Sequence, residues 1–379
     1  MKLIHRHIFA NVALTCAAAV GLLGFVLMIG NALKDLLGYM LAGQIAPDTF
    51  LKLLWLLVPF VVTYALPMGV LAGVLLVLGR MSAEREITAL RSAGLSVAGL
   101  STPILFFALL GTALSVYINF QAMPNARVTY HKELAEALTS NPLSFIVPKT
   151  FIRDFPGKVI YVGEKRGQIL KDFWLWEIDD QKRVRRAARA DSGRLDFDEK
   201  NNKLVLTLNR AQAEARDDKD PENFGQMRAA AAWEHATFDL PLDKVTGAHT
   251  VRTKLKWMTF GQLLAEWRRL GVGDPKVPTV EREKQRMKVQ IVIQEKFSTA
   301  FSVLSFALIA IPLGIKVSRK ETSANLGIAL ALAMGYYFAT IVVGWVDNRP
   351  DLRPDLLMWL PNLGFQALGL WMLVRVDRQ

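Results

Sequence analysis

The chain has 379 residues, of which 52% are hydrophobic and 21% charged, and its formal net charge is +12. An apolar fraction this high favours a membrane protein over a soluble protein of two or three domains. The single cysteine, Cys16, excludes an intramolecular disulfide, and the positive charges flank apolar stretches, which argues against a nucleic-acid partner.

Six stretches that contain no Asp, Glu, Lys or Arg are the predicted membrane spans. They comprise residues 7–33, 53–79, 92–126, 297–315, 322–346 and 356–374. Each is long enough to cross a hydrocarbon core about 30 Å thick, which takes roughly 17–25 helical residues. The first stretch is too long and too weakly terminated for a cleaved signal peptide, so we expect a retained helix.

The spans form two groups of three, which predicts an inserted domain between them. We expect spans one to three in residues 1–121, the domain in residues 122–296, and spans four to six in residues 297–379. If successive spans cross the membrane in alternating directions, ten basic residues that flank them lie on the same side. These are Lys2, Arg6, Arg80, Arg85, Arg91, Lys316, Arg319, Lys320, Arg375 and Arg378. The positive-inside rule then places both termini in the cytoplasm and the domain on the outer side of the membrane.

The inserted domain shows the two-residue periodicity of β-strands. We interpret residues 158–162, 173–176 and 203–208, which are rich in β-branched, aromatic and other apolar residues, as strands. Short strands at this spacing favour a sandwich or a jelly roll. Helical spacing returns at 259–270, and a charged helix at about 280–296 leads directly into span four. The predicted fold class is an α+β membrane protein with an inserted, periplasmic β-jelly-roll domain.

The sequence lacks the common signatures of catalysis and of metal or nucleotide binding. It contains no phosphate-binding G-x-x-x-x-G-K-[ST] loop, no paired His or Cys at metal-ligand spacing and no G-x-S-x-G turn. Nor do the spans carry mid-membrane carboxylates or histidines of the kind that ion-driven transporters use. We expect neither an enzyme active site nor a cofactor in this chain, and an energy source outside the bilayer.

The loop between spans two and three predicts a short amphipathic helix at about 82–94. Ala83, Ile87, Leu90 and Gly94 fall within one sector of a helical wheel. Ser82 suits an N-terminal cap and Gly94 a helix end. The helix either lies on the membrane surface and stabilises the topology, or it docks into a groove of an ATPase. In the second interpretation, the contacts come from the apolar anchors Ile87 and Leu90 and the rim charges Glu84, Glu86 and Arg91.

Residues 86–94, which read EITALRSAG, resemble the coupling segment of the LptF/LptG (YjgP/YjgQ) permeases of lipopolysaccharide export. Further motifs that resemble this family lie at residues 67–69, 155–157, 161–162, 191–193 and 311–315. The similarity covers the whole chain, and its specificity comes from the order and spacing of the motifs.

The resemblance implies one subunit of an ABC transporter in the bacterial inner membrane. Two permeases, LptF and LptG, would sit on a dimer of the cytoplasmic ATPase LptB, which binds the ATP and Mg. Lipopolysaccharide would leave the inner membrane, enter the periplasmic jelly roll and continue to the outer membrane over the bridge protein LptA. A single-span protein, LptC, would associate with one permease. The region around Asn141 favours the F-like subunit slightly.

The resemblance also points to lipid-binding residues. Basic residues near the outer ends of spans one and four bind the lipid headgroup in this family, and the nearest matches here are Lys34 and Lys296. An ammonium group can make a charge-assisted hydrogen bond to a lipid phosphate. The alternative is that both lysines only extend toward the membrane surface, as lysines at helix ends commonly do.

Spans one and five form the lateral gate and the partner interface in this family. Small residues that would serve there are Gly21, Gly24, Gly30, Gly327, Ala331 and Gly335. Small side chains at four-residue spacing let membrane helices approach closely. Packing within the subunit is the alternative use of the same residues.

Two other classes of membrane protein remain open. A lipoprotein-release permease also couples to an ATPase, but its large domain follows the first span, whereas three spans precede the domain here. A non-transporting scaffold that binds a periplasmic partner is the second. Co-purification with an ATP-hydrolysing subunit would exclude the scaffold.

Overall fold

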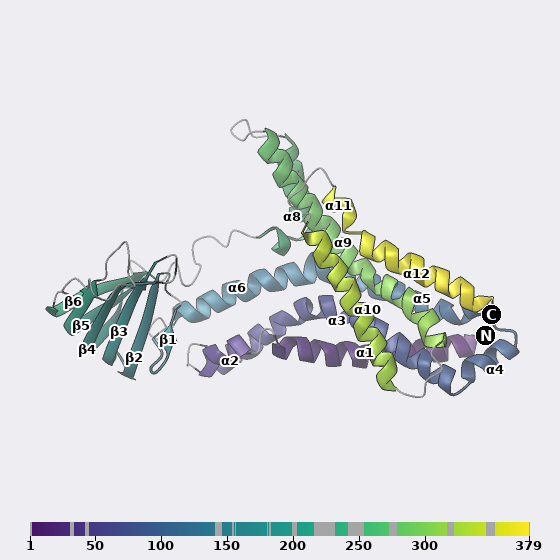
Figure 1. Cartoon of the computed structure of the whole chain (residues 1–379), viewed down its shortest axis with the longest axis horizontal. Coiled ribbons are helices and arrows are strands. Elements are labelled where there is room, and N and C mark those ends of the chain that lie inside the picture. The colour runs from purple at the N-terminus through teal and green to yellow at the C-terminus, as the bar shows by residue number, and fades with distance from the viewer. Residues whose placement is uncertain are drawn as a thin grey trace. The chain divides into compact units, whose positions relative to one another are not determined.

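The computed structural model describes residues 2–30, 34–41, 45–140, 146–153, 155, 157–179, 181, 183–198, 203–215, 232–241, 254–272, 279–316, 322–345 and 353–378. The chain divides into two compact units, and each is described by itself (Figure 1). The helical unit comprises Met1–Lys34, Leu54–Thr129 and Thr253–Gln379, and the second unit comprises Asp35–Leu53 and Tyr130–Arg252.

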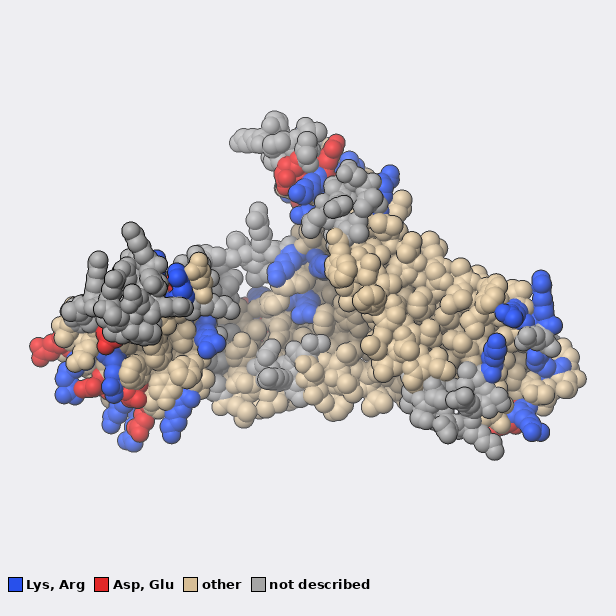
Figure 2. Space-filling view, viewed as in Figure 1, with Lys and Arg blue, Asp and Glu red and all other residues tan. Residues whose placement is uncertain are grey.

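Six helices among the described residues are long and apolar enough to cross a membrane, which confirms the predicted number of spans. The candidate spans are Leu3–Met28, Pro47–Ala83, Val97–Ala137, Glu281–Lys316, Gly327–Gly344 and Pro354–Asp377. On the face shown in Figure 2, Lys and Arg gather toward the ends of this unit and uncharged residues cover the surface between them. Such a surface suits contact with lipid.

The spanning helices are α1 (Lys2–Met28), α3 (Pro47–Ala83), α5 (Val97–Tyr117), α9 (Thr279–Lys316), α10 (Thr322–Gly344) and α12 (Leu360–Asp377). Helix α5 continues through the π-helix η2 (Ile118–Ala122) into α6 (Met123–Ser140). The shorter helices are α2 (Lys34–Leu41), α4 (Glu86–Ser92), η5 (Leu255–Trp257), α8 (Phe260–Val272) and α11 (Pro354–Leu357). Helix α9 joins the predicted charged helix at 280–296 to span four without interruption. The three-part division of the chain at residues 121 and 296 stays a prediction.

Glycines let α1 and α3 pack backbone to backbone in the helical unit. A Cβ atom on Gly69 would lie 2.8 Å from the Val20 nitrogen, and one on Gly73 would lie 2.8 Å from the Cys16 Cα atom. No side chain fits at these distances, so the four-residue spacing of the two glycines in α3 fixes the crossing point. The buried core around this crossing also includes residues of α5, α9 and α10.

A hydrogen-bonded polar network joins α9, α10 and α12 inside the same unit. The Asn362 amide nitrogen donates to the Ser298 carbonyl at 2.7 Å, and the Asn362 Oδ1 atom accepts from Ser305 at 2.8 Å and from Tyr336 at 3.1 Å. Asn362 is 0% exposed. Polar groups buried in a membrane bundle must satisfy one another, so this network ties the last three spans together.

The second unit contains an antiparallel sheet of the strands β1 (Phe151–Ile152), β2 (Lys158–Arg166), β3 (Ile169–Ile178), β4 (Val184–Asp198), β5 (Lys203–Ala215) and β6 (Ala232–Pro241). The strands are paired in chain order, so the sheet is a meander. Strands β2, β3 and β5 include the three predicted stretches, and the predicted α+β class is confirmed. The described strands form one sheet, and a jelly-roll arrangement of two facing sheets stays a prediction.

Candidate functional site

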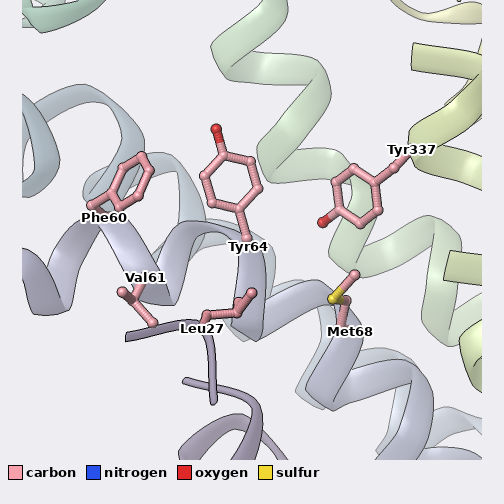
Figure 3. A pocket seen from close by; sticks show the side chains of 6 residues that line it. All are labelled: Leu27, Phe60, Val61, Tyr64, Met68 and Tyr337. Carbon is pink, nitrogen blue, oxygen red and sulfur yellow. The ribbon is translucent and has the colours of Figure 1, made fainter. Parts of the chain in front are cut away.

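An apolar cavity of about 310 Å³ lies between the spanning helices α1, α3 and α10. It is lined by Leu27, Phe60, Val61, Tyr64, Met68 and Tyr337. Figure 3 shows these side chains around the cavity, four of them from α3. The α3 residues share one helix face because they are spaced three or four residues apart. A concave, apolar site among helices is a typical place for a hydrophobic ligand.

A second cavity, of about 290 Å³, shares the side chains of Tyr64 and Tyr337 with the first. Its polar lining residues are Lys256, Glu295, Ser298, Thr299, Tyr336 and Thr340. The Tyr337 hydroxyl is buried and has no hydrogen-bond partner among the described residues. Because a buried hydroxyl without a partner is costly, it marks a point where a ligand oxygen would be stabilised. An apolar and a polar cavity with two tyrosines in common suit an amphipathic molecule.

Two cationic side chains lie beside these cavities. The Arg127 guanidinium is 3.8 Å from the centroid of the Phe60 ring, which lines the apolar cavity. The Lys256 ammonium lies 2.9 Å from a carboxylate oxygen of Glu295, and both residues line the polar cavity. Arginine and lysine are the residues that bind anionic headgroups, and here they come from α6 and from η5.

The two lysines that were predicted to bind the lipid headgroup differ from each other in what the structure describes of them. Lys34 is the first residue of α2, and its side chain lies outside the described part of the chain. Lys296 is only 7% exposed, and its ammonium donates a hydrogen bond of 2.7 Å to the Asn119 carbonyl. Lys296 therefore does not extend toward solvent as a lysine at a helix end commonly does, and its binding of a lipid headgroup stays a prediction.

The π-helix η2 explains why the Asn119 carbonyl needs this donor. Met123 N–H donates to the Ile118 carbonyl five residues earlier. The next donor in this pattern would be residue 124, which is Pro124 and has no N–H. Lys296 supplies the missing hydrogen bond to Asn119 from the neighbouring helix α9.

The loop predicted to form an amphipathic helix contains α4, which starts later than expected. Helix α3 continues to Ala83, and Arg85 has a left-handed backbone with φ of 62°. The predicted capping by Ser82 is wrong, because its hydroxyl donates to the Ile315 carbonyl at 2.8 Å. The predicted end at Gly94 is confirmed: Gly94 has φ of 87°, and its N–H donates to the Arg91 carbonyl.

The apolar face of α4 packs against its own chain. Ile87 is 4% exposed and belongs to the buried core of the helical unit, and Leu90 packs against the same core. The chain itself covers Ile87, whereas Leu90 is only half-buried, and the predicted role of these two residues as anchors for a partner stays a prediction. Glu84 and Glu86 are exposed, and Arg91 is half-buried. A protein that contacts this segment would meet the acidic residues first.

The small residues predicted for a gate or interface are not used for close packing within the described chain. A Cβ atom on Gly21, Gly30, Gly327 or Gly335 would meet no described atom within 4 Å, and Gly24 makes only an ordinary contact with Val61. Ala331 is exposed on α10. Packing within the described chain therefore does not account for Gly21, Gly30, Gly327 or Gly335, whereas Gly69 and Gly73 do serve that purpose.

A family model described as the lipopolysaccharide export system permease LptF/LptG matches residues 6–375. The chain belongs to the LptF/LptG family. Curated relatives include the lipopolysaccharide export system permease proteins LptF of Escherichia coli K12, of Escherichia coli O157:H7 and of Shigella flexneri. Each is 26% identical over 358 residues, which cover 91% of this chain and 89% of the relative.

Membership of the LptF/LptG family confirms the resemblance deduced from the short motifs. Together with the six apolar helices, it makes this chain a multi-pass protein of the inner membrane and a permease by family. The predicted site residues are brought together in part: Glu84, Glu86, Ile87, Leu90 and Arg91 share one short segment. Lys296 lies apart from it, next to the π-helix.

Sequence reasoning missed the residues that line the cavities of this LptF/LptG permease. Phe60, Tyr64 and Met68 recur every four residues in an uncharged run, and this spacing was the available signal. Tyr337 gave no such signal, because its role depends on where α10 packs. Arg127 was equally hidden, as its position beside Phe60 follows from the packing of α6 against α3.

Proposed function

We propose that this chain is a permease subunit of an ABC transporter that extracts lipopolysaccharide from the inner membrane. The observation that carries the proposal is the apolar cavity at Tyr64, Met68 and Tyr337, which adjoins a polar cavity in a family of lipopolysaccharide export permeases. An acyl chain would occupy the apolar cavity. A polar group of the same lipid would meet the Tyr337 hydroxyl.

In this proposal, the cations that meet the lipid headgroup are Arg127 and Lys256. Both stand beside the cavities, Lys256 in an ion pair with Glu295, while Lys296 donates a hydrogen bond to the Asn119 carbonyl. Lys34 is retained as a further candidate. Phosphate groups accept strong hydrogen bonds from guanidinium and ammonium groups, most of all where water is scarce.

The energy would come from a partner ATPase dimer, LptB, which would carry the ATP and Mg. The exposed carboxylates of Glu84 and Glu86 support α4 as the contact, on the cytoplasmic side together with both termini. The Ser82 hydrogen bond to Ile315 would pass a movement of this segment to α9. This order of events needs no nucleotide site in the chain itself.

The remaining partners follow from the same proposal. The exposed small residues of α1 and α10 support contact with a homologous permease, LptF with LptG, and a lateral gate between them. The similarity to LptF supports the F-like subunit for this chain. The periplasmic sheet would receive the lipid and pass it to LptC and LptA, toward the outer membrane.

Filling the apolar cavity tests the transport site. Met68→Trp would occupy the space of an acyl chain, so we expect at least a tenfold loss of ATP-dependent lipopolysaccharide release from proteoliposomes to LptA, or about 1.4 kcal/mol. ATP hydrolysis should continue. Leu114→Trp, at an exposed position on α5, is the matched control.

Unchanged release by the Met68→Trp variant would remove the cavity from the transport path. Failure of the chain to co-purify with any ATP-hydrolysing subunit would favour the non-transporting scaffold instead.

A further inference from the structure

A groove of about 640 Å³ lies on the outer surface of α12, near the carboxyl end of the helix. It is lined by Leu370, Trp371, Val374, Arg375 and Arg378. These residues share one helix face because they recur at spacings of three and four. The face is apolar along the membrane span and becomes cationic where the span ends.

Both arginines of this groove are exposed. Within the described part of the chain, neither Arg375 nor Arg378 has a carboxylate within ion-pair distance. The nearby carboxylate of Asp377 is used elsewhere: its Oδ1 atom accepts a hydrogen bond of 3.0 Å from the Val97 N–H at the start of α5. The acid therefore faces the bundle and the arginines face the groove. Figure 2 shows Lys and Arg gathered at this end of the helical unit.

The indole of Trp371 completes the groove. The Arg375 guanidinium lies 5.5 Å from the centroid of the Trp371 ring. Tryptophan is enriched at the level of lipid headgroups, where its ring is partly apolar and its N–H remains polar. The groove thus offers apolar side chains for an acyl chain, an indole ring beside them and, toward the end of the helix, two cations that can bind a phosphate.

We propose that this groove binds an anionic phospholipid, separately from the cavities assigned to the transported lipid. The phosphate lies between Arg375 and Arg378, and an acyl chain lies along Leu370 and Val374. Guanidinium groups match phosphate oxygens in pairs, and charge complementarity selects anionic over zwitterionic headgroups. Arginines that merely reach toward the membrane surface would also attract anionic lipids, but their effect would not depend on the apolar part of the groove.

The test compares two lipids with the same acyl chains on the purified full chain in detergent. Phosphatidylglycerol should raise the melting temperature by on the order of 3 °C more than phosphatidylcholine, because a bound ligand stabilises the folded state. The double variant Arg375→Gln, Arg378→Gln should lose at least half of this difference. Lys316→Gln, which removes an exposed cation at the end of α9, should retain it.

Val374→Trp is a second variant that keeps both arginines but fills the groove, and it should also lose the selective stabilisation. If the double variant does not fold, the lipid response of Val374→Trp tests the proposal instead. The proposal is overturned if wild type does not distinguish the two lipids, if either groove variant responds as wild type does, or if inorganic phosphate reproduces the effect. A double variant that keeps the lipid response but no longer binds the ATPase would assign the surface to that protein.

Discussion

Lys296 illustrates how a residue can have the expected type and position in the sequence and still make a contact in the structure that the sequence does not show. A lysine at the end of an apolar run predicts a cation near the lipid headgroups. The chain instead uses its ammonium to replace the N–H that Pro124 lacks, at the carbonyl of Asn119. The sequence contains both residues, but not the information that α9 passes the π-helix at this point.

Lys296→Met keeps most of the side-chain volume and removes the donor to Asn119. We expect the free energy of unfolding to fall by roughly 1–3 kcal/mol, because a buried carbonyl loses its partner. Thermal unfolding in detergent measures this effect. Lipopolysaccharide cross-linking from position 337, counted per folded molecule, should stay unchanged. Normal stability with lost cross-linking would restore Lys296 to the headgroup site.

Asn362 is a second residue whose role depends on packing, since an uncharged asparagine does not interrupt an apolar run. Its side chain joins Ser298, Ser305 and Tyr336. Hydrogen bonds between membrane helices contribute roughly 0.6 kcal/mol each.

Asn362→Leu should therefore destabilise the bundle by about 2 kcal/mol, and Tyr336→Phe by roughly 0.6 kcal/mol. Unfolding in a graded detergent mixture provides the measurement. Equal losses from the two variants would contradict the central place of Asn362 in the network.

At the scale of elements, α4 shows what helical periodicity determines. The wheel correctly grouped Ile87 with Leu90 on one apolar face, but periodicity does not say which surface covers that face. The chain covers it with its own bundle, and the Ser82 hydrogen bond to Ile315 holds the same segment against α9. The strands could be predicted for a similar reason. Which side chains share one face of a strand depends only on their spacing in the sequence.

Reversing the exposed charges of this segment should separate coupling from folding. With Glu84→Arg and Glu86→Arg, we expect at least a tenfold loss of ATPase co-purification and an unchanged melting temperature. Ile87→Asp should lower the melting temperature, because it buries a carboxylate in the core. Glu283→Arg, an exposed acid in α9, is the control. Full ATPase binding by the double variant would leave the segment with a structural role only.

The exposed small residues of α10 give a prediction for a whole helix face. Ala331→Trp adds bulk at an exposed position of α10, so the isolated subunit should fold with its normal stability. If this face meets the homologous permease, recovery of that partner should fall at least tenfold, which is about 1.4 kcal/mol. Leu109→Trp, exposed on α5, is the control. Equal recovery of the partner with both variants would assign the face to lipid.

At the scale of the whole molecule, the sequence allowed the spans and several of the strands to be predicted, but not the cavities. The length of an uncharged run can be read directly from the sequence, and this length decides whether a helix can cross a bilayer. The cavity at Tyr64 and Tyr337 depends on how α3 and α10 cross, and the Gly69 and Gly73 contacts with α1 help to fix that geometry. Crossing angles arise from many side chains at once.

The meander order of the sheet has a consequence for biosynthesis. Each strand from β2 to β6 pairs with the strand that the ribosome has made just before it. Its pairing with that strand therefore needs no residue from later in the chain. Pairings between sequence neighbours close short loops and form quickly. The ribosome still has α9, α10 and α12 to add when β6 is complete. We therefore expect the sheet to be folded before the last three helices are inserted into the membrane.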